Sequence, residues 1–256
     1  MNSSDRQLSG REINILIKHG MWPINLQKIG QKPIEYVVGK AEFLDKEFEV
    51  SKNTLIPRIE TEELVYEVLK DCLELFDPQK DLTIADVGTG SGCIGISLFI
   101  KLLEHDFVPK MILSDLSEPA LKVAKKNLLK LITPVNQTKF TLLQSDLLLD
   151  YPDSIAPDVI VANLPYIPRE NLKKLDSSVK DFEPSSALDG GKFKGLTLVL
   201  ELMVQLQKLP KRPKLIAFEV DEFVKFEDLP DISGFQKSVR QDSFQKNRFV
   251  VFLGKV

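Results

Sequence analysis

The sequence predicts an α/β protein with a doubly wound, mostly parallel sheet. Beyond residue 82, short runs of β-branched and other apolar residues alternate with longer segments whose apolar residues recur at helical spacing. Parallel neighbours need a crossover helix, so this alternation is typical of a parallel sheet between two helical layers. The 256 residues, 43% of them hydrophobic, suffice for one sizeable core and a small appendage.

The first part of the chain predicts local structure and no separate domain. Between residues 8 and 29, apolar residues are spaced for one or two short helices, interrupted at Gly20 and Pro23. The segment Tyr36–Val50 predicts a β-hairpin, because strand formers flank a polar turn at Asp45–Lys46.

The main domain is expected to follow in a regular order. Thr61 is expected to cap a helix that Asp77 and Pro78 stop. The strands expected after it are Thr83–Val87, Lys110–Ser114, Phe140–Leu143, Asp158–Ala162, Leu215–Val220 and Arg248–Leu253. The helices expected between them are Cys93–Leu103, Glu118–Leu131 and Leu196–Leu206. The last strand follows residues 238–240 after a short loop, so we expect it to return as an antiparallel hairpin partner.

Composition narrows the classes of function. A net charge of -3 and a pI near 5.6 give no overall positive field for sequence-independent nucleic-acid binding. Cys72 and Cys93 fit neither a metal site nor a disulfide framework, and His19 and His105 have no partners in sequence for histidine-based chemistry. Residues 1–11 contain no apolar core of signal-peptide length, and no run approaches the roughly 18 apolar residues that span a bilayer, so we expect a cytoplasmic protein that does not enter membranes.

A glycine-rich segment follows the first main strand and opens the next helix. Glycines are needed where the backbone turns sharply and lies against a ligand. The G-x-G-x-G spacing, and Asp86 before the first glycine, favour a ligand with an ammonium group and a sulfonium over a pyrophosphate, which a carboxylate would repel. The alternative is an ordinary tight turn between strand and helix. The candidate ligand-binding residues here are Asp86, Gly88, Thr89, Gly90, Ser91 and Gly92.

The next two strands also end in acidic residues. Asp115 is placed to accept both ribose hydroxyls of a nucleoside; the alternative is that it caps the helix beginning at Glu118. Asp146 is placed to accept an adenine amino group, with Leu147 against the ring, or it is a turn residue.

The fourth strand ends in Asn163-Leu164-Pro165-Tyr166, the most specific feature of the chain. In open α/β sheets the ligand crevice lies beyond the carboxyl ends of the strands. We therefore expect the features at four consecutive strand ends to converge on one cleft.

On these residues, the sequence resembles the class I methyltransferases, and within them the glutamine N(5)-methyltransferases of peptide chain release factors, the HemK or PrmC family. Nucleic-acid methyltransferases share the Asn-x-Pro-Tyr type of motif but not normally the flanking stretches, which favours a glutamine target. The resemblance covers residues 32–256 and includes Pro33–Gly39, Ile56–Glu62, Glu183–Leu188, Gly190–Gly191 and Gly195–Leu196.

The resemblance implies a Rossmann-like, seven-stranded sheet of the class I methyltransferase type with an antiparallel last strand. It divides the chain into a short helical N-terminal segment (1–32), a β-hairpin linker (33–54) and an S-adenosylmethionine-dependent methyltransferase domain (55–256). It further implies S-adenosyl-L-methionine as cofactor, S-adenosyl-L-homocysteine as product and no metal. The expected partner is a peptide chain release factor as substrate, with no stable nucleic-acid binding, and the expected state is a monomer.

The resemblance also assigns roles in the reaction. Asn163 Oδ1 and the Leu164 carbonyl are expected to accept the two amide protons of the target, and Asn163 also contacts the cofactor. Pro165 is expected to stiffen the loop, and Tyr166 to pack against the planar amide or to be a partly buried core aromatic.

Arg58 and Glu60 lie on a loop that borders the cleft by resemblance. They are expected to bind the substrate backbone, or else to form a solvated surface ion pair.

The chain departs from the family pattern in two places. Leu164 stands where the family usually has proline, and only residues 1–32 precede the matching region, where the family carries a longer helical domain. Two other functions stay open: an adenine- or guanine-amino methyltransferase acting on nucleic acid, and a non-catalytic cofactor-binding scaffold in which Leu164 marks lost activity.

Overall fold

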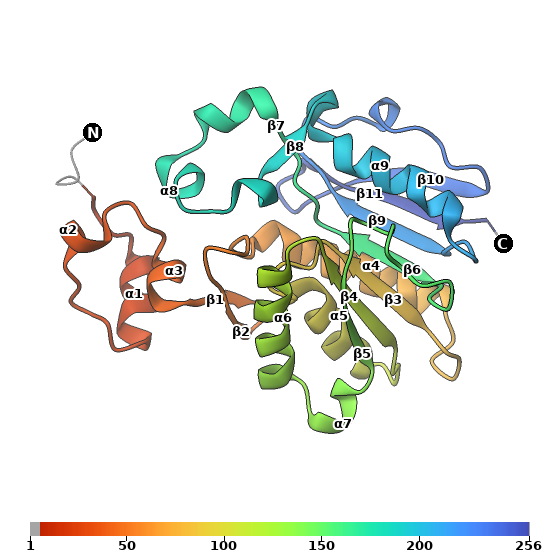
Figure 1. Ribbon diagram of the computed structural model, residues 1–256, viewed down its shortest axis with the longest axis horizontal. Coiled ribbons are helices and arrows are strands. Elements are labelled where there is room, and N and C mark those ends of the chain that lie inside the picture. The colour runs from red at the N-terminus through yellow and green to blue at the C-terminus, as the bar shows by residue number, and fades with distance from the viewer. Residues whose placement is uncertain (1–5, 256) are drawn as a thin grey trace.

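Seven strands form the central sheet of the computed structural model, which describes residues 6–255 (Figure 1). They are β3 (Thr83–Val87), β4 (Lys110–Asp115), β5 (Phe140–Gln144), β6 (Val159–Ala162), β9 (Leu215–Glu219), β10 (Phe235–Gln241) and β11 (Asn247–Gly254). Their order across the sheet is β10-β11-β9-β6-β3-β4-β5. Only β11 runs antiparallel to its neighbours, β9 and β10, and the other pairs are parallel. The predicted sheet and its antiparallel last strand are confirmed.

Helices cover both faces of this sheet, because its strands are apolar on both sides. In β3, Ile84 packs into the core shared with α4 (Ile59–Leu75) and α5 (Cys93–Leu103), while Ala85 packs into the core shared with α9 (Thr197–Gln205). A strand presents alternate side chains to opposite faces, so one short strand serves both cores. The helix α6 (Glu118–Leu131) adds Leu128 to the first core. The predicted doubly wound arrangement is confirmed.

The N-terminal segment is described from residue 6 onward, so residues 1–5 of the predicted segment 1–32 lie outside the described residues. It forms three short helices and a two-stranded hairpin that lie to one side of the central sheet (Figure 1). These elements are α1 (Gly10–Lys18), α2 (Leu26–Ile29), α3 (Ile34–Val38), β1 (Lys40–Phe43) and β2 (Lys46–Glu49).

The strand predicted at residues 36–38 is wrong, because these residues belong to α3. Pro33 precedes the helix, and Gly39, at φ 76°, ends it in the left-handed conformation. These start and stop residues outweigh the β-propensity of the residues between them. The hairpin follows, and its turn consists of Leu44 and Asp45, at φ 45° and 58°. Lys46 already pairs in β2, so the turn lies one residue earlier than predicted.

A long excursion joins β6 to α9 and lies above the sheet in Figure 1. It contains a two-stranded parallel sheet and short helices, and part of it closes the cavity described below. Its elements are β7 (Ile167–Pro168), η1 (Arg169–Lys174), α8 (Ser177–Lys180), η2 (Ser185–Ala187), β8 (Asp189–Gly191) and η3 (Phe193–Gly195). The remaining short helices are α7 (Pro134–Gln137), η4 (Leu206–Lys208) and η5 (Phe226–Asp228).

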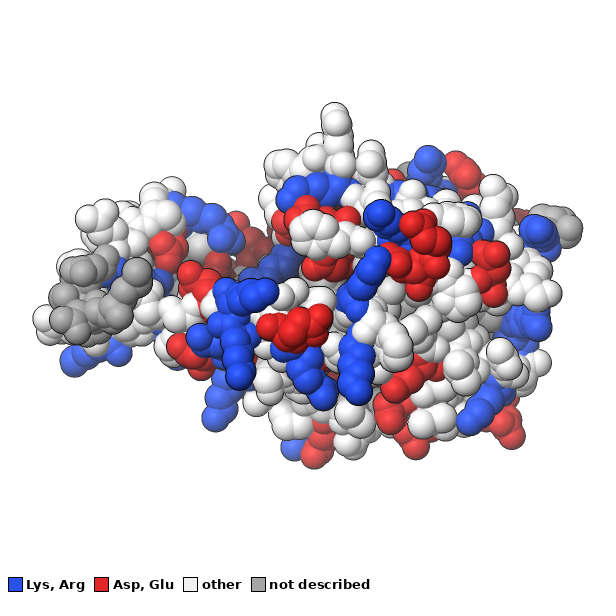
Figure 2. All heavy atoms as spheres, turned by 90° about the horizontal axis from the view of Figure 1, so that it is seen from above, with Lys and Arg blue, Asp and Glu red and all other residues white. Residues whose placement is uncertain are grey.

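The surface carries charges of both signs. Figure 2 shows Lys and Arg side chains together with Asp and Glu side chains over the face seen from above, and several basic side chains gather around an acidic group near the middle of that face. Within residues 6–255, no helix combines the length and apolarity needed to cross a membrane.

Candidate active site

A cavity of about 250 Å³ opens at the carboxyl ends of β3, β4, β5 and β6. The chain reverses its direction of travel across the sheet between β3 and β6, and such switch points are where open α/β sheets bind ligands. The predicted site residues that line this cavity are Gly88, Gly90, Asp115, Asp146, Leu147, Asn163, Leu164 and Pro165. The sequence therefore predicted one cleft, and the fold brings most of its members together.

The glycine loop between β3 and α5 is held against β4. Gly88 N–H and Thr89 N–H both donate to the Ser114 carbonyl, at 2.9 and 2.8 Å. Gly88 and Gly90 have φ of 73° and 55°, a conformation that strongly favours glycine. The space that a Cβ on Gly90 would occupy has no heavy atom within 4 Å, so the loop leaves room for a ligand there.

Asp86 lies beneath this loop and does not line the cavity. Its side chain is fully buried, and Oδ2 accepts hydrogen bonds from Thr89 Oγ1 at 2.6 Å and from Gly95 N–H at 2.9 Å. Burial raises the pKa of Asp86 to about 6, and Oδ1 has no partner among the described residues. The carboxylate therefore shapes the loop from below, and its predicted contact with an ammonium group stays a prediction.

Asp115 does not cap the helix that begins at Glu118, and its contact with ribose hydroxyls stays a prediction. Its Oδ2 accepts from Gly90 N–H at 2.9 Å and its Oδ1 from Ser117 N–H at 2.8 Å, so it joins the glycine loop to the start of α6. Ser117 is the actual N-cap and accepts from Ala120 N–H. Asp115 also lines the cavity, and each oxygen has a second lone pair for a hydroxyl donor. Burial raises the pKa of this carboxyl group.

The end of the third strand, β5, also lines the cavity. Asp146 is exposed, and its carboxylate makes no hydrogen bond or ion pair with the described residues, although its N–H donates to Asp150 Oδ2 at 3.0 Å. Leu147 is buried and, with Leu198, gives the cavity an apolar surface. This pairing of a free carboxylate with an apolar wall suits a flat, amine-bearing ring.

Asn163 is held by a buried polar network. Its Nδ2 donates to Thr61 Oγ1 at 3.0 Å, and Thr61 Oγ1 donates to Glu219 Oε2 at 2.7 Å. The prediction that Thr61 caps a helix is wrong: α4 begins at Ile59 after Arg58, and the Thr61 hydroxyl points to the buried carboxylate instead. Glu219 was missed, although an acidic residue within the apolar run 215–220 was a usable signal.

The residues after Asn163 build the floor of the site. Leu164 is only 4% exposed and packs in the core with Leu147 and close to Gly88. Pro165 lines the cavity. Tyr166 does not line it; its hydroxyl donates to Glu219 Oε1 at 3.1 Å, and burial raises its pKa.

The glycines of the excursion are explained by close backbone contacts. A Cβ on Gly190 or Gly195 would collide with the backbone of Tyr166. Glycine at these two positions therefore lets the excursion pack directly on the loop that carries Asn163.

Arg58 and Glu60 lie apart from this cavity. They line a second cavity, of about 680 Å³, between the N-terminal segment and α8. Arg58 pairs with Glu183, whose side chain is buried and also accepts from Ile56 N–H at 3.3 Å. Arg58 is thus anchored on a buried carboxylate and is not part of a freely solvated loop; its contact with substrate stays a prediction.

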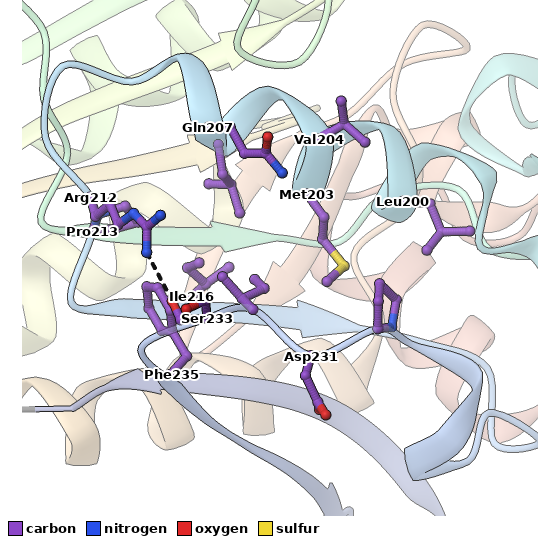
Figure 3. Close-up of a pocket in the computed structure, with 13 residues that line it drawn as sticks. Leu200, Met203, Val204, Gln207, Arg212, Pro213, Ile216, Asp231, Ser233 and Phe235 are labelled. Carbon is purple, nitrogen blue, oxygen red and sulfur yellow. Dashed lines mark hydrogen bonds between the residues drawn. The ribbon is translucent and has the colours of Figure 1, made fainter.

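A third cavity, of about 700 Å³, lies between α9 and the segment before β10 (Figure 3). Its wall is mainly apolar and contains none of the predicted site residues. Arg212 is held there by its hydrogen bond to the Ser233 carbonyl at 2.9 Å. Ile216, near the amino end of β9, belongs to this wall, so the cavity is remote from the strand ends that form the site. No cluster of three or more possible metal ligands occurs among residues 6–255.

Comparison with known proteins identifies release factor glutamine methyltransferases as relatives, although no family model matches the chain. The release factor glutamine methyltransferase of Clostridium acetobutylicum is 34% identical over 235 residues, which are 89% of this chain and 77% of the relative. Those of Flavobacterium psychrophilum and Leptospira interrogans are 39% and 40% identical over 163 residues, covering 64% of this chain. The matched region spans about half of these two relatives, 54% of each.

Solved structures confirm the fold. The hMettl16 catalytic domain in complex with MAT2A 3'UTR hairpin 6 has a TM-score of 0.56 at 12% identity, covering 91% of this chain and 93% of that chain. The human methyltransferase 10 domain containing protein has a TM-score of 0.52 at 15% identity, covering 82% and 89%. At such identities the likeness concerns the methyltransferase fold alone.

Proposed function

Because the chain belongs to the family of release factor glutamine methyltransferases, we propose that it transfers a methyl group from S-adenosylmethionine to the side-chain amide nitrogen of a glutamine in a protein. One observation carries the proposal. Asn163 and Leu164 line a cavity whose other lining residues suit a nucleoside.

The cavity fits the cofactor on the geometry of its own residues. Asp115 offers carboxylate oxygens to the ribose hydroxyls, and Asp146 with Leu147 suits the adenine ring. The open space beside Gly90 leaves room for the atoms that link them. When bound, S-adenosylmethionine supplies a methyl group already activated on a sulfonium, so the protein's task is alignment and exclusion of water.

Asn163 and Leu164 would align the methyl acceptor. An amide nitrogen is a poor nucleophile because its lone pair is delocalised. Asn163 Oδ1 and the Leu164 carbonyl would accept its two protons, hold the nitrogen in place and favour the positive charge that develops during attack. Leucine keeps the carbonyl that the usual proline offers, and Leu164 and Pro165 line the cavity beside it.

The proposed partner is a peptide chain release factor, methylated at the glutamine of its GGQ motif. The second cavity, which Arg58 and Glu60 line, would bind the backbone of the release factor. We propose that the enzyme works as a monomer in the cytoplasm and without a metal ion. A pI near 5.6 favours a protein substrate over a nucleic acid.

Label transfer tests the proposal. The protein is incubated with methyl-labelled S-adenosylmethionine and, separately, with release factors, ribosome-associated proteins, DNA and RNA. We expect label on a release factor, recovered as methylated glutamine after digestion. Label on DNA or RNA would establish the alternative of a nucleic-acid amino methyltransferase instead. Cofactor binding without methyl transfer to any of these substrates would establish the alternative of a non-catalytic cofactor-binding scaffold.

A further inference from the structure

Glu219 is a buried carboxylate to which the reaction described above gives no role. It is the last residue of β9 and is fully buried beneath the loop that follows β6. Thr61 Oγ1 donates to its Oε2 at 2.7 Å, and the Tyr166 hydroxyl donates to its Oε1 at 3.1 Å. Within residues 6–255 it forms no ion pair. Both oxygens therefore act as acceptors from hydroxyl groups, the pattern of an ionised carboxylate.

Thr61 transmits this pattern to Asn163. A threonine hydroxyl has one proton, and Thr61 uses it in the hydrogen bond that it donates to Glu219. Its oxygen can then only accept a second hydrogen bond, and it accepts one from Asn163 Nδ2 at 3.0 Å. The reversed amide would place Oδ1 against an oxygen with no free proton, which is unfavourable. The buried carboxylate thus determines which end of the Asn163 amide faces Thr61.

We propose that Glu219 and Thr61 are positioning residues that fix the Asn163 amide with Oδ1, and not Nδ2, directed at the methyl-accepting nitrogen. The inference rests on the proposed function insofar as Asn163 holds that nitrogen. A reversed amide would present its own N–H groups to the N–H groups of the substrate, and donors cannot bind donors. The hydrogen-bonded chain from Glu219 through Thr61 to Asn163, called the relay below, therefore selects the catalytically useful one of two nearly isosteric orientations of the amide.

A proton on Glu219 would reverse the relay. A carboxylic acid can donate to Thr61, whose hydroxyl can then donate to Asn163 Oδ1. Burial raises the pKa of Glu219 to about 7, so this exchange falls in the neutral range. The useful orientation gains population as pH rises through that value. The titratable and charged groups that face Glu219 are Glu60 of α4, Tyr166 of the loop after β6, Cys93 of α5 and Arg248 of β11.

The neighbouring charges do not replace the relay. Arg248 favours the ionised form of Glu219, but its Nε is paired with Asp242 Oδ2 at 3.2 Å. Glu60 opposes ionisation. Among residues 6–255, the hydrogen bonds to the two carboxylate oxygens come from the hydroxyl groups of Thr61 and Tyr166, so removing one hydroxyl perturbs this network directly.

The first experiment removes the hydroxyl of Thr61. Thr61→Val keeps the shape of the side chain, and Thr61→Ser restores a hydroxyl. Ser97→Ala is the matched control, because Ser97 is also buried on a helix but its hydroxyl has no hydrogen-bond partner in the described part of the chain. We expect kcat to fall about tenfold or more in Thr61→Val. Thr61→Ser should recover most of it, and S-adenosylmethionine affinity should stay constant in all three. Wild-type kcat in Thr61→Val, or an equal loss in Thr61→Ser, would overturn the proposal.

A second measurement does not depend on the substrate. In ¹⁵N-labelled protein, the side-chain amide signals of Asn163 are the pair missing from Asn163→Ala. We expect this pair to shift between about pH 6 and pH 8 in the wild type and to stay fixed in Glu219→Gln, which cannot ionise. Signals that do not move in the wild type, or that move equally in both proteins, would refute the relay. If the wild type methylates no glutamine, the proposed function fails, and these signals still decide on the relay.

Discussion

Adding one methyl group at Gly90 tests whether the cavity beside the glycine loop binds S-adenosylmethionine. In Gly90→Ala the new Cβ meets no protein atom within 4 Å, so it projects into the space left for the ligand. At φ 55° the alanine costs about 1–2 kcal/mol of stability, which lowers Tm by a few degrees. Overpacking against a bound ligand costs about 1–3 kcal/mol. We therefore expect cofactor affinity to fall roughly 5- to 150-fold by calorimetry.

Gly39→Ala is the matched control for backbone strain. Gly39 has φ 76°, also has no heavy atom within 4 Å of its would-be Cβ, and lies outside the cavity at the end of α3. It should lose a similar few degrees of Tm and bind the cofactor normally. Wild-type affinity in Gly90→Ala, or an equal loss of affinity in Gly39→Ala, would refute the location of the cofactor.

Three further substitutions test individual parts of the site. Asp115→Ala should weaken S-adenosylmethionine binding by about 1.5–3 kcal/mol, and unchanged affinity in calorimetry would remove Asp115 from the site. Leu164→Pro should keep turnover within a few-fold, because only the carbonyl is needed; a large loss of turnover at unchanged Tm would give the leucine side chain or amide a specific role. Glu219 has its pKa raised from 4.5 to about 7, so its contribution to stability is complete below the unfolded value and is lost as pH rises through about 7. Glu219→Gln should therefore gain stability over the wild type with rising pH, by at most about 3.4 kcal/mol above pH 7, as measured by urea unfolding. A difference in stability that does not depend on pH would contradict the buried charge.

The main domain was predictable because its boundaries carry local signals. The start of α5 is marked in the sequence by Gly92, and the start of α6 by Ser117 and Pro119. The strands between them are continuous apolar runs, as parallel strands buried on both faces must be. The prediction at residues 36–38 was wrong because tyrosine and valine favour strands, while Pro33 and Gly39 enclose a segment that suits a single helical turn.

The network around Asn163 was not predictable, because it depends on contacts distant in sequence. Thr61 and Glu219 are 158 residues apart, and Asn163 lies between them in the chain. A threonine near the start of a helix ordinarily caps that helix. Only the fold shows that the Thr61 hydroxyl instead donates its hydrogen bond to a buried carboxylate. Asp86 illustrates the same limit: its position before the glycines suggests a ligand contact, while its hydrogen bonds support the loop from beneath.

The most direct test of the central claim is methyl transfer to a purified release factor, with the modified atom located by mass spectrometry. The wild-type protein and Asn163→Ala are compared at saturating S-adenosylmethionine, after circular dichroism has shown that both are folded. We predict one methyl group on the side-chain nitrogen of the GGQ glutamine, and a turnover about a hundredfold lower in Asn163→Ala. A methyl group on another residue, or equal turnover in the two proteins, would contradict the account.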